Sequence, residues 1–260
     1  MAIKVSEKMS LAEIEKERLR QRETRIEEIM ELIAELEKPE TVKEVLKNEG
    51  VELDMEKLVV AGHSMGAWTV LELANRTKKV KAVIALDPPF NWGVKPMASC
   101  PLENLSPLDS TKAPHLIINT ERFPYLMKKT SGEEFAYMHE QSKKYLLEQS
   151  IEKGAQIEQV ELRRATHMGQ HDGAVLKPFE IMLAHDEWLP NTKYIVQLHI
   201  NGNLAVRFLE KVGILDPLLE GKGDEEIAKG SKKIYGAIAA LKKMCGFYEE
   251  LKYYKYDNKV

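Results

Sequence analysis

The sequence has 260 residues, of which 43% are hydrophobic and 30% are charged, and its formal net charge is −3 at pH 7. This composition is typical of a globular protein with one substantial domain, and the small negative charge gives no electrostatic basis for binding nucleic acid. Only two cysteines, Cys100 and Cys245, are present. Such sparse use favours a reducing compartment, so we expect a cytoplasmic protein. The first residues lack the apolar core of a signal peptide, and no apolar run approaches the roughly 18 residues of a membrane span.

Helical periodicity dominates the first part of the chain. Ser10 and Glu13 form a capping box, and the apolar residues that follow recur at helical spacing, which predicts an amphipathic helix over 10–37. Pro39 is expected to stop this helix, and Thr41 is expected to cap a short second one. The alternating lysines and glutamates of the first helix predict a solvated face.

Four short apolar runs then alternate with helical patterns. They are "LVVAG" (58–62), "VKAVIALD" (80–87), "HLIINTE" (115–121) and "IEQVELR" (157–163). Short, nearly continuous apolar strands with helices between them are typical of βαβ units, in which a parallel sheet is buried on both faces. We therefore predict an α/β fold with a parallel sheet.

The segments between and after these runs are predicted to be mainly helical. One helix follows the first strand and ends near Ala74, and a long helix separates the third strand from the fourth. Beyond the fourth strand, helices are expected near 174–186, 192–212 and 224–245. The aromatic and basic tail is expected to be a loosely ordered terminus.

The stretch "VVAGHSMGAWTV" (59–70) contains a G-x-S-x-G pattern between a predicted strand and a predicted helix. In this pattern a serine nucleophile lies on a tight strand-to-helix turn. Gly62 and Gly66 are expected to leave the room that the bend needs, because side chains there would strike the neighbouring strand or helix. Ser64 is therefore the candidate nucleophile, and the backbone N–H of Met65 is a candidate donor to the developing oxyanion.

A serine nucleophile needs a base, and the base needs an acid that orients it. In this type of fold the expected order along the chain is Ser, then Asp or Glu, then His. Asp87 and Glu121 end the second and third strands at the edge of the sheet where Ser64 is expected, so this reasoning leaves both open as the acid. His167 directly follows the fourth strand and is favoured as the base over His171.

The remaining histidines are not expected to be catalytic. His63 is expected to pack beside the serine turn, and His115 begins a strand. The other three, His139, His185 and His199, fall on predicted helices, where hydrogen-bonded or exposed imidazoles are usual. No cluster of cysteines and histidines has the spacing of a zinc site, so we expect neither a metal nor another cofactor.

Five segments carry a family resemblance: "RLRQRETRIEEIMELI", "DMEKLVVAGHSMGAWTV", "VKAVIALDPPF", "APHLIINTERF" and "RRATHMGQ". Over about residues 15–221 the chain resembles the platelet-activating factor acetylhydrolases, which are serine phospholipases with an α/β-hydrolase fold. The resemblance implies Ser64 as the nucleophile, Asp87 rather than Glu121 as the acid and His167 as the base. It also implies calcium-independent hydrolysis of the sn-2 acetyl, short or oxidised acyl ester of phospholipids related to platelet-activating factor.

The resemblance also sets expectations for the domain and its partners. We expect a single partial α/β-hydrolase domain over 1–260, with a helical lead-in at 1–56, the sheet and catalytic residues at 57–222, and a C-terminal helix and tail at 223–260. Family members carry a long region before the first helix seen here, so the sequence is expected to be a fragment or an incomplete gene model of a larger esterase. A phospholipid substrate and transient contact with a membrane surface are expected; no oligomeric state is predicted.

Two alternative functions stay open. The chain could be a catalytically silent family member that acts as a binding or interaction protein. It could also hydrolyse another carboxylic ester, because the fold alone does not fix the substrate.

Overall fold

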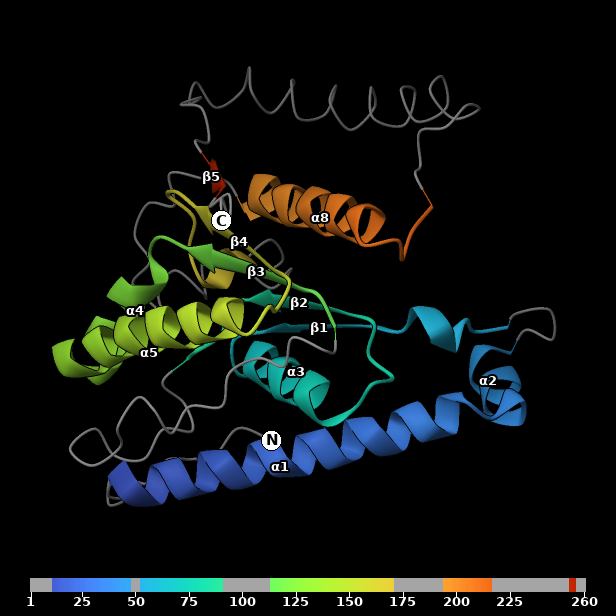
Figure 1. Cartoon of the computed structure of the whole chain (residues 1–260). Helices are drawn as coiled ribbons and strands as arrows, with labels where there is room; N and C mark the ends of the chain where they lie inside the picture. Colours follow the sequence, from blue (N-terminus) through green and yellow to red (C-terminus); the bar gives the residue numbers. More distant parts are fainter. Residues whose placement is uncertain (1–10, 48–51, 91–112, 171–193, 217–252, 256–260) are drawn as a thin grey trace.

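A five-stranded sheet forms the centre of the structure, a computed structural model that describes residues 11–47, 52–90, 113–170, 194–216 and 253–255 (Figure 1). In order across the sheet the strands are β1 (Val59–His63), β2 (Ala82–Leu86), β3 (His115–Thr120), β4 (Ile157–Leu162) and β5 (Tyr253–Lys255). Strands β1 to β4 are parallel, and β5 pairs antiparallel with β4. The predicted α/β class and the four predicted strands are confirmed.

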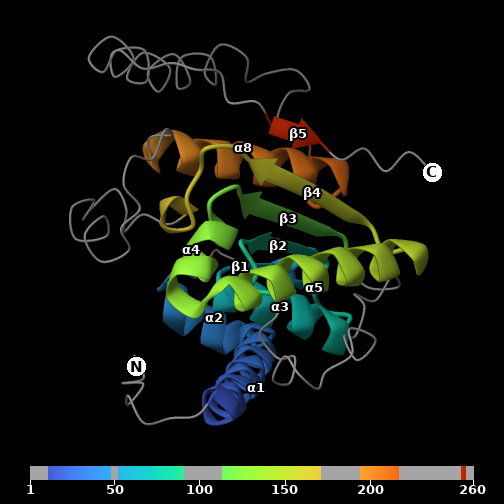
Figure 2. The same ribbon diagram turned by 90° about the vertical axis from the view of Figure 1, so that its left-hand side faces the viewer.

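Helices cover both faces of this sheet (Figures 1 and 2). They are α1 (Leu11–Leu36), α2 (Pro39–Leu46), α3 (Met65–Arg76), α4 (Phe123–Ser131), α5 (Glu133–Glu152) and α8 (Tyr194–Lys211), with 3₁₀ turns at Met55–Lys57 and Met168–Gln170. Side chains of α1, α3 and α5 pack on one face, and α8 packs on the opposite face. Among the described helices, none is long and apolar enough to cross a membrane.

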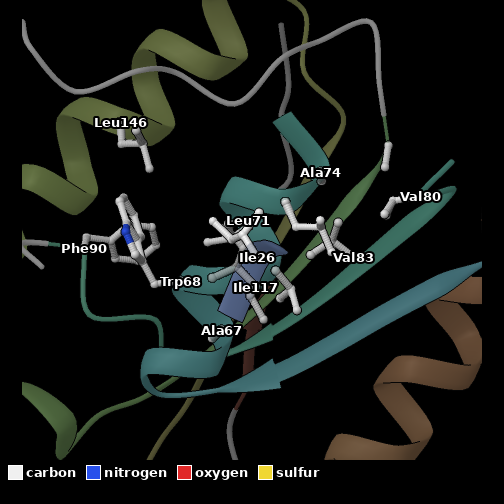
Figure 3. Packing of buried hydrophobic residues seen from close by; sticks show 14 of the residues in the cluster. Ile26, Ala67, Trp68, Leu71, Ala74, Val80, Val83, Phe90, Ile117 and Leu146 are labelled. Carbon is white, nitrogen blue, oxygen red and sulfur yellow. The ribbon is translucent and has the colours of Figure 1, made fainter. Parts of the chain in front are cut away.

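Two apolar clusters fill the layers on either side of the sheet. The larger cluster joins Ile26 of α1 to residues of α3 and α5 and to Ile117 of β3 (Figure 3). On the other face, Leu116 and Ile118 pack with Phe208 of α8. Successive residues of a strand point to opposite faces, and every residue of β3 is buried, so both of its faces are covered. The apolar run Leu116–Ile118 at its centre suits this setting.

The long helix α1 is fixed against α3 by apolar contacts and a bidentate ion pair. Ile26 and Ile33 of α1 are buried in the shared cluster. Arg76, at the end of α3, donates to both carboxylate oxygens of Glu23, at 2.5 and 2.9 Å. This bonding to Glu23 raises the pKa of Arg76 above its ordinary value. Paired N–H···O bonds of this kind add geometric specificity, so they set the position of α1 on the helix that follows Ser64.

Two boundaries differ from the sequence predictions. Helix α2 begins at Pro39 with Lys38 in the N-cap position, so the predicted cap at Thr41 is wrong. Proline suits the first turn because its missing N–H would have no acceptor there. The long helix predicted before the fourth strand is confirmed as α5, but α4, separated from α5 at Gly132, is not among the predicted elements.

The end of the chain also differs from its prediction. Tyr253–Lys255 were expected to be loosely ordered, but they form β5 and pair with residues 160–162 of β4. Aromatic residues such as Tyr253 and Tyr254 favour a strand once an edge is available to pair with. The helix predicted near 192–212 is confirmed as α8. Several predictions lie outside the described residues: the cap at Ser10, the helices near 174–186 and 224–245, the two cysteines, His171 and His185.

The register of the sheet brings the carboxyl ends of β1 to β4 to one edge. His63 lies opposite Leu86, Leu86 lies opposite Ile118, and Thr120 lies opposite Leu162. In open α/β sheets this edge is where ligands bind. Ser64 and Asp87 directly follow β1 and β2, and His167 lies in the loop after β4.

Candidate active site

Ser64 lies on the turn between β1 and α3 in a conformation that residues with side chains rarely adopt. Its φ is 55° and its ψ is −125°. Its backbone N–H donates to the carbonyl oxygen of Leu86 at 2.9 Å, and its own carbonyl accepts from the N–H of Ala67 at 2.9 Å. Such a conformation costs on the order of 1–3 kcal/mol and persists only where the surroundings enforce it. The turn therefore has the sharp geometry of the predicted nucleophile elbow.

The two glycines of this turn have different roles. A Cβ on Gly62 would lie 2.3 Å from the backbone oxygen of Gly66 and 2.7 Å from the backbone nitrogen of Ala67. A Cβ on Gly66 would meet nothing within 4 Å. The expected steric requirement is confirmed for Gly62 but is wrong for Gly66, because the Cβ direction of Gly66 in the first turn of α3 points into open space.

Asp87 is fully buried directly after β2, and its carboxylate accepts several hydrogen bonds. Oδ1 accepts from the backbone N–H of Thr120, and Oδ2 accepts from the Thr120 hydroxyl, both at 2.6 Å. Oδ2 also lies 3.2 Å from Nδ1 of His167. Because a carboxylate only accepts, the neutral imidazole carries its proton on Nδ1, and Nε2 of His167 is left as an acceptor.

Glu121, the other candidate for the acid, has a different place. It is exposed after β3, and its Oε2 accepts the backbone N–H of Arg164 at 2.5 Å. Arg164 has a φ of 58° in the turn after β4. Glu121 therefore stabilises the turn that leads to His167, and among the described residues Asp87 is the carboxylate bonded to that imidazole.

Side-chain amides of α8 and of the neighbouring 3₁₀ turn hold the loop that carries His167. The buried Gln197 accepts the backbone N–H of Thr166 at 3.3 Å through Oε1 and donates Nε2–H to the Thr166 carbonyl at 2.8 Å. Asn201, one turn further along α8, donates to Oε1 of Gln170 at 3.1 Å. These bonds fix the chain on both sides of the imidazole.

Two rings lie against the imidazole of His167. The Phe123 ring stacks on it, with centroids 4.1 Å apart and planes 9° apart. The His63 ring lies 4.4 Å away at a tilt of 37°, and its Nε2 is 3.0 Å from the backbone oxygen of His167. His63 is the neighbour of Ser64 in the chain, so the structure brings the serine turn and the histidine loop together at the carboxyl edge of the sheet.

Two further histidines are buried and neutral. Burial lowers the pKa of His115 to about 4 and that of His139 to about 3. Both ring nitrogens of His115 and Nδ1 of His139 lack hydrogen-bond partners. The expectation that His139 is hydrogen-bonded or exposed is wrong, because it lies between the rings of Phe90 and Phe123 and is 1% exposed.

Within the described residues, His63, Asp87 and His167 form a group whose possible metal-ligand atoms all lie within 4.8 Å of one another. Two imidazoles and a carboxylate are chemically suited to zinc. Their closeness is already accounted for by the bond between Asp87 and His167 and by the bond from His63 to the His167 carbonyl. The set suits proton transfer better than ligation, because a metal would have to replace these bonds.

Several residues of the site are missing from the sequence predictions, among them Thr120, Phe123 and Gln197. A threonine that ends an apolar strand was the one available signal, since a polar side chain there lies at the carboxyl edge. Phe123 and Gln197 follow ordinary helical patterns. Their contacts with the histidine loop depend on packing between elements far apart in the chain.

A parallel sheet, a strained serine turn after one strand and an Asp–His pair after two others define the α/β-hydrolase class. A solved structure, the ferulic acid esterase from Streptomyces cinnamoneus, matches with a TM-score of 0.50 and 19% sequence identity. The match covers 84% of this chain and 54% of that enzyme, so this chain spans about half the length of the esterase. At this identity the likeness shows the fold alone.

The family is shown by sequence. Residues 1–159 match the family described as platelet-activating factor acetylhydrolase, isoform II. The chain belongs to this family. The matched range includes Ser64 and Asp87, whereas His167 lies beyond it. A sequence search of curated proteins finds no match.

Proposed function

We propose that this chain is a serine esterase that cleaves the sn-2 acetyl, short or oxidised acyl ester of phospholipids related to platelet-activating factor. The observation that carries the proposal is the buried bond between Asp87 and Nδ1 of His167, beside the strained turn of Ser64. This bond leaves Nε2 of the imidazole free to take a proton. Nucleophile, base and acid follow three parallel strands at one edge, as this chemistry requires.

The reaction proceeds in two halves. Nε2 of His167 accepts the proton of the Ser64 hydroxyl while Oγ attacks the ester carbonyl, and the negative charge moves to the carbonyl oxygen. The N–H of Met65 at the start of α3 stabilises that oxygen. The protonated imidazole then gives its proton to the departing lysophospholipid oxygen, leaving an acyl-serine. Water, deprotonated by His167, attacks the acyl-serine, releases the acid and restores the serine hydroxyl.

The substrate part of the proposal rests on family membership. The family is described by its action on platelet-activating factor, whose cleaved group is a short acyl ester. Transient contact with a membrane surface and action in the cytoplasm, as favoured by the two cysteines, belong to the same proposal.

Labelling with a fluorophosphonate probe tests the nucleophile. The full chain should be labelled with one probe per molecule, and Ser64→Ala should abolish labelling. Ser142→Ala is the matched control, because Ser142 is a buried serine of α5 and should leave labelling unchanged. A folded chain that takes no probe would contradict the esterase proposal and support the silent binding protein.

Comparison of ester substrates tests the specificity. Release of acetate from an sn-2 acetyl phospholipid should be faster than release of a long-chain acid from the corresponding long-chain lipid. Equal rates would leave an esterase without the proposed acyl-chain preference.

A further inference from the structure

The imidazole of His167 contacts two rings from different elements. The ring centroids of Phe123 and His63 lie 4.1 and 4.4 Å from its own centroid. Phe123 belongs to α4 and His63 to β1, so two elements far apart in the chain contact the same imidazole.

The bond between His63 and the histidine loop has a defined direction. Nε2 of His63 lies 3.0 Å from the backbone oxygen of His167, and a carbonyl oxygen can only accept. His63 therefore donates Nε2–H. One side chain thus contacts both the ring of His167 and its main chain.

Three different contacts restrict the rotation of the His167 ring, the tilt of its plane and the position of its main chain. Asp87 bonds Nδ1 and sets the rotation of the ring within its plane. The stacked ring of Phe123 sets the tilt of that plane. The donor of His63 fixes the peptide that follows the imidazole Cα. Because His63 directly precedes Ser64, this last bond also ties the base to the turn that carries the nucleophile.

We propose that His63 is a positioning residue for the ester hydrolysis described above, on which this inference rests. Its Nε2–H bond to the carbonyl of His167 sets the distance and direction of proton transfer between Ser64 and His167. A displacement of about 1 Å in such a group lowers a rate about 10²-fold. His63 therefore acts on kcat through His167 and has little effect on KM.

Two substitutions separate the hydrogen bond from the ring. His63→Gln keeps an N–H donor at about the reach of Nε2 but removes the ring. His63→Phe keeps a ring of similar shape but removes the donor. His63→Phe should lower kcat about 10- to 100-fold with KM within about twofold, and His63→Gln should restore kcat to within about threefold of wild type.

His115→Gln is the matched control. His115 begins β3, at the opposite end of the strand from Thr120 and the site, and is also a buried histidine. His115→Gln therefore shows how kcat responds when the fold loses stability but the site keeps its residues. Measured well below its unfolding temperature, His115→Gln should keep the wild-type kcat.

The readouts are kcat and KM on p-nitrophenyl acetate, the rate of fluorophosphonate labelling, and the downfield proton NMR signal of the bond between His167 and Asp87. The NMR signal should broaden or shift in His63→Phe and persist in His63→Gln. Unchanged kcat in His63→Phe, or equal losses in both variants, would overturn the inference. If wild type itself takes no probe, the proposed function fails instead, and the NMR comparison still decides whether His63 holds the imidazole.

Discussion

Buried polar side chains have different surroundings on the two faces of the sheet. Around α8, the amide of Gln197 bonds the loop of His167, and the amide of Gln170 donates to the Ile118 carbonyl. The carboxylate of Asp87 accepts three bonds. Toward α5 several buried groups lack partners, although the Ser150 hydroxyl has one. His115 and Asn119 share the face of β3 that carries Ile117, and they have no side-chain hydrogen bonds. Ser142 and Nδ1 of His139, both on α5, also lack them.

The paired groups near α8 and the unpaired groups near α5 have different physical effects: the first hold the site rigid, and the second lower the stability of the fold. A connected polar network in a buried setting holds its members in one arrangement, which proton transfer between fixed groups requires. A buried polar group without a partner instead costs about 1–3 kcal/mol of folding free energy. We infer that the α8 face supplies the geometry of the site, while the α5 face lowers the stability of the fold.

The largest expected effect is at Asp87. Asp87→Asn should lower kcat by about 10⁴-fold, because an amide favours the wrong tautomer of His167. The matched control is Glu121→Gln, which changes the other strand-end carboxylate and should lower kcat far less. Steady-state kinetics on a short-chain ester, with folding checked by circular dichroism, measures both. A larger loss in Glu121→Gln would reverse the assignment of the acid.

The α8 network comes next. Gln197→Leu leaves the N–H of Thr166 buried without a partner, while the Thr166 carbonyl keeps its bond from the N–H of Gly169. The free energy of unfolding should therefore fall by about 1–3 kcal/mol. The loop of His167 is then less well held, and kcat should fall about 10- to 100-fold. Asn203→Leu, an exposed position on the same helix, is the control and should change neither quantity much. Urea unfolding and kinetics are the measurements. Wild-type kcat in Gln197→Leu would break the link between this network and the site.

The α5 face predicts a dependence of stability on pH. Burial lowers the pKa of His139 from 6.5 to about 3, so between these pH values the unfolded chain binds a proton that the folded chain does not. The free energy of unfolding therefore falls as the pH drops below about 6.5, by about 1 kcal/mol per unit for this group. His139→Leu should remove that part of the slope between pH 6 and pH 5 in urea titrations. An unchanged slope would show that His139 is not buried as a neutral ring.

The smallest expected effect is at Ser142. Ser142→Ala removes an unpaired buried hydroxyl and adds a better helix former, so the free energy of unfolding should rise by about 1 kcal/mol. Ser150→Ala is the matched comparison on the same helix, because the Ser150 hydroxyl donates to the Leu146 carbonyl at 2.6 Å. Urea midpoints should rank Ser142→Ala above Ser150→Ala. The opposite order would contradict the contrast between paired and unpaired groups.

Features encoded by nearby residues were predictable from the sequence. Each apolar strand is a short contiguous run, and the serine turn is defined by Gly62 and the strand and helix that flank it. The sequence alone did not decide between Asp87 and Glu121 as the acid, because both end parallel strands; the family resemblance favoured Asp87. Residues whose roles depend on packing between distant elements were not predictable. Gln197 and Phe123 follow helical patterns, and only the folded arrangement places them against His167.

The positive φ of Ser64 means that glycine is the residue this backbone would accept most easily. Ser64→Ala deletes the hydroxyl but keeps the Cβ, so the positive φ stays unfavourable. Ser64→Gly deletes the hydroxyl and the Cβ, so the same φ no longer costs free energy. The glycine form should therefore be an inert and more heat-resistant scaffold than either the wild type or the alanine form. This form is suited to crystallography with an uncleaved lipid. The rise in its unfolding temperature would measure the stability that the fold loses by holding Ser64 at a positive φ.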